Sequence, residues 1–142
     1  MRSLLVTVAL WICTHGVLAS DWIEVGADPE TRYFVDVDSI RTVGENVVFT
    51  KRGVYTHVLT DNFGGHPTTF KESRGNIELD CAQRVNRVTL IELLAETGAL
   101  VWTSGPMARR MWEQVKPNTH AETTMAFVCA RVNYQIDPRQ PR

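Results

Sequence analysis

The chain has 142 residues, of which 44% are hydrophobic, with 15 Lys and Arg against 16 Asp and Glu and with three cysteines. This length suits one ordinary domain and excludes a cofactor domain joined to a separate substrate domain. The near-neutral charge argues against binding to nucleic acid or acidic membranes by bulk electrostatics, and the apolar content argues against a disordered chain.

The N-terminus has the pattern of a secretory signal peptide. Arg2 precedes a short apolar segment, residues 4–13, and small or modest residues then lead to Ala19. A charged start, a short apolar segment and a small-residue site predict cleavage after Ala19, with Ser20 as the second choice. The alternative is an uncleaved anchor, but a membrane-spanning helix needs about 20 mostly apolar residues, and His15 interrupts the segment. We therefore predict that residues 1–19 are a signal peptide.

The odd cysteine count resolves with this cleavage. Cys13 leaves with residues 1–19, and Ile12 before it is too large for a lipoprotein signal, so we predict an exported protein without a lipid anchor. The mature chain then has 123 residues, a net charge of −2 and two cysteines, Cys81 and Cys129. In an oxidising compartment such a pair predicts one disulfide, and closing a loop of about 49 residues contributes roughly 4 kcal/mol in the chain-entropy model.

Zinc is the alternative use of the two cysteines. It would require further ligands near in space, and the mature histidines, His57, His66 and His120, have no CxxC or HxxxH spacing. We therefore predict no metal site.

The mature chain predicts one domain over residues 21–134, followed by a flexible tail, residues 135–142. Apolar and β-branched runs, separated by glycine-containing turns, predict six consecutive strands. They cover residues 22–25, 33–35, 47–59, 77–81, 85–94 and 100–103.

Three details of this strand pattern matter later. Lys51, Arg52 and Gly53 in the middle of a long run suggest a bulge. Residues 61–75 are polar and contain glycines, which predicts a loop with at most a frayed strand end. Residues 77–81 alternate strictly, which places Cys81 on a buried face and Glu78 and Asp80 in water.

One helix is expected near the C-terminus. Thr119, with Glu122 three residues later, forms a capping box, in which each side chain accepts a hydrogen bond from a free backbone N–H. An apolar stripe at helical spacing follows it and includes Met125 and Cys129. A helix that buries this stripe on the sheet brings Cys129 towards Cys81. The predicted fold class is therefore α+β: an antiparallel meander of about six strands, one C-terminal α-helix packed on it, and one disulfide.

Catalytic chemistry is not indicated. No serine lies in a nucleophile-elbow pattern, and no glycine-rich phosphate loop follows a strand. His57, Asp61 and His66 form a weak candidate for ligand contact, because they flank the polar segment, but their spacing imposes no geometry. The aromatic residues are expected to pack in or around the core, and we predict neither a catalytic residue nor a cofactor.

The ordered string of features resembles the surface-adhesin protein E-like domains of exported proteobacterial proteins. Three segments carry the resemblance: an opening Trp22 followed by the pattern of residues 25–41, FKESRGNIELDC at residues 70–81, and WEQVKPNTHAETTMAFVC at residues 112–129. The family implies a sheet of about six strands with a C-terminal helix fixed by the two cysteines. It also implies a non-enzymatic protein, because its namesake is a surface lipoprotein that binds host matrix proteins, with dimer formation and haem binding also associated with it.

From these observations we expect an exported binding protein, periplasmic or secreted, that recognises an unidentified protein partner through its sheet or through residues 61–75. Neither nucleic acid nor a membrane is an expected partner after cleavage. The family resemblance also implies that the protein can form a homodimer. The alternative function is binding of haem or a metal in the cell envelope through His57 and His66.

Overall fold

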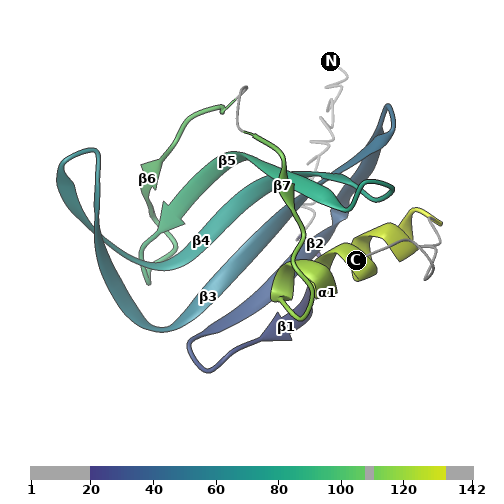
Figure 1. Cartoon of the computed structure of the whole chain (residues 1–142). Coiled ribbons are helices and arrows are strands. Elements are labelled where there is room, and N and C mark those ends of the chain that lie inside the picture. Colours follow the sequence, from purple (N-terminus) through teal and green to yellow (C-terminus); the bar gives the residue numbers. More distant parts are fainter. Residues whose placement is uncertain (1–19, 108–110, 134–142) are drawn as a thin grey trace, which may run out of the picture.

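The computed structural model describes residues 20–107 and 111–133 (Figure 1). The predicted signal peptide, its cleavage site and the predicted tail lie outside the described residues, so they stay predictions.

The described part is an antiparallel sheet with one helix. Six strands follow one another across the sheet in sequence order, and the short β7 pairs with β5. The elements are β1 (Trp22–Ala27), β2 (Thr31–Val43), β3 (Asn46–Phe63), β4 (His66–Asp80), β5 (Val85–Leu94), β6 (Leu100–Thr103), β7 (Glu113–Gln114) and α1 (His120–Arg131). This architecture confirms the predicted α+β meander.

The long hairpin of β3 and β4 corrects the prediction for residues 61–75. That segment is not a loop, because only Gly64 and Gly65 lie between the two strands. Both glycines have positive φ, 63° and 86°, which a tight hairpin turn requires at its two central positions. Polar strands that project from the sheet bury little side-chain surface, so the segment shows no hydrophobic alternation.

The predicted bulge at residues 51–53 was also misplaced. Lys51, Arg52 and Gly53 pair in regular register with β2, and the irregularity in β3 lies between Val54 and Leu59. The regular register matters because successive side chains of a strand point to opposite faces. Lys51 and Arg52 therefore belong to different surfaces of the molecule.

Strands β5 and β6 match their predicted ranges, whereas β7 was not expected. Two residues carry no detectable pattern, and β7 is held by pairing with Val85 and Asn86. The next residue, Val115, donates its N–H to the Arg84 carbonyl at 2.9 Å and is buried. The chain between β6 and α1 is thereby attached to the sheet beside the helix.

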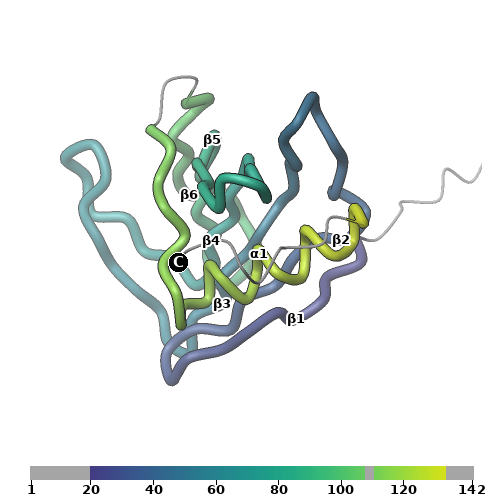
Figure 2. Tube along the Cα trace, turned by 45° about the vertical axis from the view of Figure 1, so that its right-hand side comes forward, coloured from purple at the N-terminus to yellow at the C-terminus, as the bar shows by residue number. Residues whose placement is uncertain are grey.

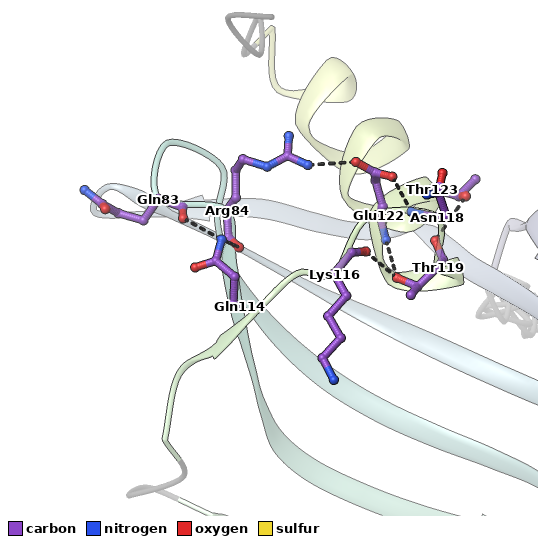
Figure 3. A network of polar contacts seen from close by, with 8 residues as sticks. All are labelled: Gln83, Arg84, Gln114, Lys116, Asn118, Thr119, Glu122 and Thr123. Atoms are coloured by element: carbon purple, nitrogen blue, oxygen red, sulfur yellow. Dashed lines mark hydrogen bonds and ion pairs between the residues drawn. The ribbon is translucent and has the colours of Figure 1, made fainter. Parts of the chain in front are cut away.

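Helix α1 has the predicted cap (Figure 3). The hydroxyl of Thr119 accepts from the Glu122 N–H at 3.4 Å, and the Glu122 carboxylate accepts from the Asn118 N–H at 2.8 Å. Arg84 adds an ion pair of 2.8 Å to the same carboxylate, which ties the start of the helix to the turn before β5.

The helix buries its apolar stripe on one face of the sheet. Met125, Val128 and Cys129 are almost fully buried, and α1 packs on β1 and β2, as Figure 2 shows. The predicted disulfide is present, with 6.0 Å between the Cα atoms of Cys81 and Cys129. We call the sheet face under α1 the covered face and the opposite side the open face.

The alternation predicted for residues 77–81 is confirmed for its apolar members only. Leu79 and Cys81 are buried. Glu78 is not freely solvated as expected: its carboxylate accepts from Asn46 at 2.7 Å and pairs with Arg87 at 2.6 Å. Glu78 thus forms a cross-strand ion pair, whereas the alternation alone predicted that it would be solvated.

Candidate functional site

The open face carries a row of side chains that crosses five strands. The backbone register places Glu24, Phe34, Arg52, Arg74 and Glu92 side by side on β1 to β5. We call these five residues the open-face row. The side chains of this row point to the open face, because their neighbours along the strands, such as the fully buried Val35, point to the covered face.

Arg52 lies at the centre of this row between two aromatic rings. Its guanidinium carbon is 4.6 Å from the centroid of Phe34 and 4.5 Å from that of Trp22. Both rings are half-buried on β1 and β2. A guanidinium at these distances gains cation–π attraction from each ring, which limits its freedom to move.

The other arginines nearby have carboxylate partners, and Arg52 has none among the described residues. Arg32 forms an ion pair with Glu24, and Arg74 pairs with Glu72 at 2.6 Å. The Nε atom of Arg52, in contrast, is buried and has no hydrogen-bond partner within the same part of the chain. The row thus has a positioned cation without a matching anion at its centre.

Arg52 and its two rings are of residue types that occur often at protein interfaces. Arginine and the large aromatic residues are enriched at such interfaces and contribute the largest share of binding energy there. The sequence predicted Trp22 and Phe34 only as packing residues, and it missed Arg52. No sequence signal marked it, because the contact of Arg52 with the two rings depends on the register between β1, β2 and β3.

The weak candidates from the sequence lie in the β3–β4 hairpin. His57 falls in the irregular part of β3, Asp61 pairs with Thr68, and His66 opens β4, all three being exposed. Across residues 20–107 and 111–133, no three His, Cys, Asp or Glu side chains are placed to hold a metal ion. This geometry does not favour the haem or metal alternative, and contact of these residues with a ligand stays a prediction.

A second aromatic group packs along this hairpin, starting at its closing pair, Phe63 and His66. Phe63 lies 4.8 Å from Trp102 and 6.0 Å from Phe70, whose ring is also 5.6 Å from Tyr55, measured between centroids. Phe70 is buried, so these rings form a small core at the hairpin. This is the packing role that the sequence predicted for Tyr55 and Trp102.

Comparison with known proteins decides the family. The model of the family described as surface-adhesin protein E matches residues 22–130. The chain belongs to this family. The match covers the whole described sheet and almost all of α1, and it confirms the resemblance seen in the sequence.

Solved structures of Haemophilus influenzae protein E have the same fold. Crystal form II of Haemophilus influenzae protein E superposes with a TM-score of 0.55 at 15% identity, covering 82% of this chain and 98% of the other. The selenomethionine form gives 0.53 at 16% identity, with 82% and 95% coverage. No curated protein matches the chain.

Membership of this family makes the chain an adhesin-like surface protein. A search of the described helices finds none that is long and apolar enough to cross a membrane.

Proposed function

We propose that the protein is an exported, non-enzymatic, adhesin-like binding protein that recognises another protein through the open face of its sheet. The observation that carries the proposal is Arg52, held between Trp22 and Phe34 without a carboxylate of its own in the described residues. Family membership supports the general class, and the open-face row supports the choice of surface over the β3–β4 hairpin.

The partner group that this site suits is a carboxylate. A guanidinium offers donors in a planar fork that can bind both oxygens of Asp or Glu. The two rings hold Arg52 in place before binding, so less side-chain freedom is lost when the complex forms. The neighbouring Arg32 and Arg74 already form ion pairs with Glu24 and Glu72. An acidic partner would therefore bind Arg52, which has no such ion pair.

The proposal includes the cellular setting. Cleavage after Ala19 releases one domain, residues 21–134, into the periplasm or the medium, without a lipid anchor. The partner is a protein of the host matrix or of the bacterial envelope. A homodimer is the second association that the resemblance implies, and sedimentation of the purified protein tests it separately.

The test measures binding of the exported protein to immobilised extracellular-matrix proteins and envelope extracts, with Arg52→Ala as the variant. We expect Arg52→Ala to weaken binding at least about tenfold, as for a central interface residue. Arg131→Ala is the matched control, because Arg131 stacks on Phe127 at 4.9 Å but belongs to α1. Absence of any retained partner, or equal binding by Arg52→Ala, would contradict the proposal.

A further inference from the structure

The covered face of the sheet contains a cavity of about 380 Å³ between the strands and α1. Its floor is apolar and is formed by Phe49, Ile77, Leu79 and Val88 on β3 to β5, while Met125 lines it from the helix. The helix packs on β1 and β2, and β7 pairs with β5, so this space lies between them. The volume falls near the lower end of the roughly 300–1,000 Å³ that small-molecule sites occupy.

Lys51 is placed at one end of this floor. It follows Phe49 by two residues on the same face, and the register sets it beside Gly75, one row beyond the apolar row of Phe49, Ile77 and Val88. Its Nζ atom lies 4.8 Å from the ring centroid of Tyr33. Because Gly75 has no side chain, no neighbour on β4 covers the lysine.

The ammonium of Lys51 has no hydrogen bond or ion pair to any described residue. A cation removed from water without a partner costs stability, and burial accordingly lowers the pKa of Lys51 to about 8. The groups near it are the ring of Tyr33 on β2 and the imidazole of His120 on α1, which stack at 4.1 Å. Burial and the charge of Lys51 both lower the pKa of His120.

The acidic groups nearby do not neutralise Lys51. Asp28 accepts a hydrogen bond from the Tyr33 hydroxyl at 2.8 Å and two more from backbone N–H groups. Glu113 lines the cavity from β7, but the register pairs it with Asn86, two rows from Lys51. Two lysines line the cavity: Lys51 lies at one end of the apolar floor, and Lys116 follows β7. Lys51 is the one on the sheet itself, with the apolar floor leading away from it.

We propose that this cavity binds a small amphipathic anion, a medium-chain aliphatic carboxylate, with its tail on the row of Phe49, Ile77 and Val88 and its carboxylate on the Lys51 ammonium. The apolar floor stabilises the chain of methylene groups, and the carboxylate supplies the anion that Lys51 lacks. This site lies on the face opposite Arg52 and is independent of the protein-binding proposal.

The test is a calorimetric titration of the exported protein with decanoate below its micelle concentration, alongside decanol and decyltrimethylammonium, which share the tail. We expect decanoate to bind best. Lys51→Met should lower its affinity at least about tenfold, since it removes the charge-assisted contact but keeps the length of the side chain. The control is Lys71→Met, because Lys71 donates to the Thr56 carbonyl at 2.7 Å and does not line the cavity.

Chemical shifts provide the second measurement. Decanoate should perturb the methyl signals of Ile77, Val88 and Met125, which line the cavity. Equal affinity for decanoate and decanol, equal decanoate affinity in Lys51→Met, or shifts confined to other residues would overturn the proposal.

Discussion

Lys51 and Arg52 are adjacent in β3, carry the same charge and lie in opposite environments. Arg52 lies near two aromatic rings on the open face, whereas Lys51 lies on the covered face, where its ammonium has no hydrogen-bond or ion-pair partner among the described residues. A guanidinium is weakly hydrated and stacks well, while an ammonium is strongly hydrated and loses more on burial. The difference indicates that each cation suits a different ligand, a protein carboxylate outside and a small anion inside.

The disulfide maintains this difference, and its removal should have the largest effect. Cys81 and Cys129 are 48 residues apart, and the bond holds α1 on the covered face. Replacing both cysteines with serine should lower the free energy of unfolding by about 4 kcal/mol, because the unfolded chain gains the freedom of an open loop. Urea denaturation measures this loss. An unchanged midpoint and slope would show that packing alone fixes the helix.

The next largest effect concerns Lys51 and pH. Its pKa falls from 10.5 to about 8 on folding, so between these pH values the unfolded chain binds more protons and stability rises with pH. Lys51→Met should therefore stabilise the protein by about 3 kcal/mol at pH 7. This advantage over the wild type should shrink as pH rises through 8 towards 10.5.

Urea titrations of both proteins at pH 7 and pH 10 measure this difference. Taking the difference removes the contribution of groups whose pKa does not depend on Lys51, including Tyr33 and Asp28. His120 does not cancel, because the charge of Lys51 lowers its pKa in the wild type alone. Lys71→Met serves as the comparison. If it gave the same stabilisation and the same pH dependence, burial of Lys51 would not be the cause.

A smaller effect is expected at the start of α1, which forms part of the cavity wall. Thr119→Ala removes the hydroxyl that accepts from the Glu122 N–H and donates to the Lys116 carbonyl at 2.7 Å. We expect a loss of about 1 kcal/mol in the free energy of unfolding, as for other helix caps. Thr119→Ser, which keeps the hydroxyl, should restore most of it. Equal losses in both variants would attribute the effect to the methyl group instead.

The smallest expected effects are those of each substitution on the ligand of the other site. Arg52→Ala should change decanoate affinity by less than about twofold, and Lys51→Met should leave protein binding equally unaffected, because the two side chains point to opposite faces of the sheet. Calorimetry measures the decanoate affinity, and binding to the immobilised proteins measures the second effect. A strong crossed effect in either direction would show that the two faces are coupled through β3.

Local patterns predicted the parts of the fold that depend on local chemistry. The strand at Val85–Leu94 is rich in β-branched and aliphatic residues, and the helix has its Thr119 cap and apolar stripe. The β3–β4 hairpin was missed because polar strands show no alternation, and β7 because two residues are too few for a pattern. Neither site could be predicted, since Arg52 depends on cross-strand register and Lys51 on where α1 packs.

The positions of the two cysteines also bear on how the protein is made. Cys81 follows β4 and Cys129 lies in α1, 48 residues later, so the bond can form only once the chain from β5 to α1 is available for folding. With Cys13 removed, as predicted, no third thiol exists to form an incorrect intramolecular bond. For a chain cleaved as predicted, we therefore expect oxidation to give one intramolecular bond without the help of a disulfide isomerase.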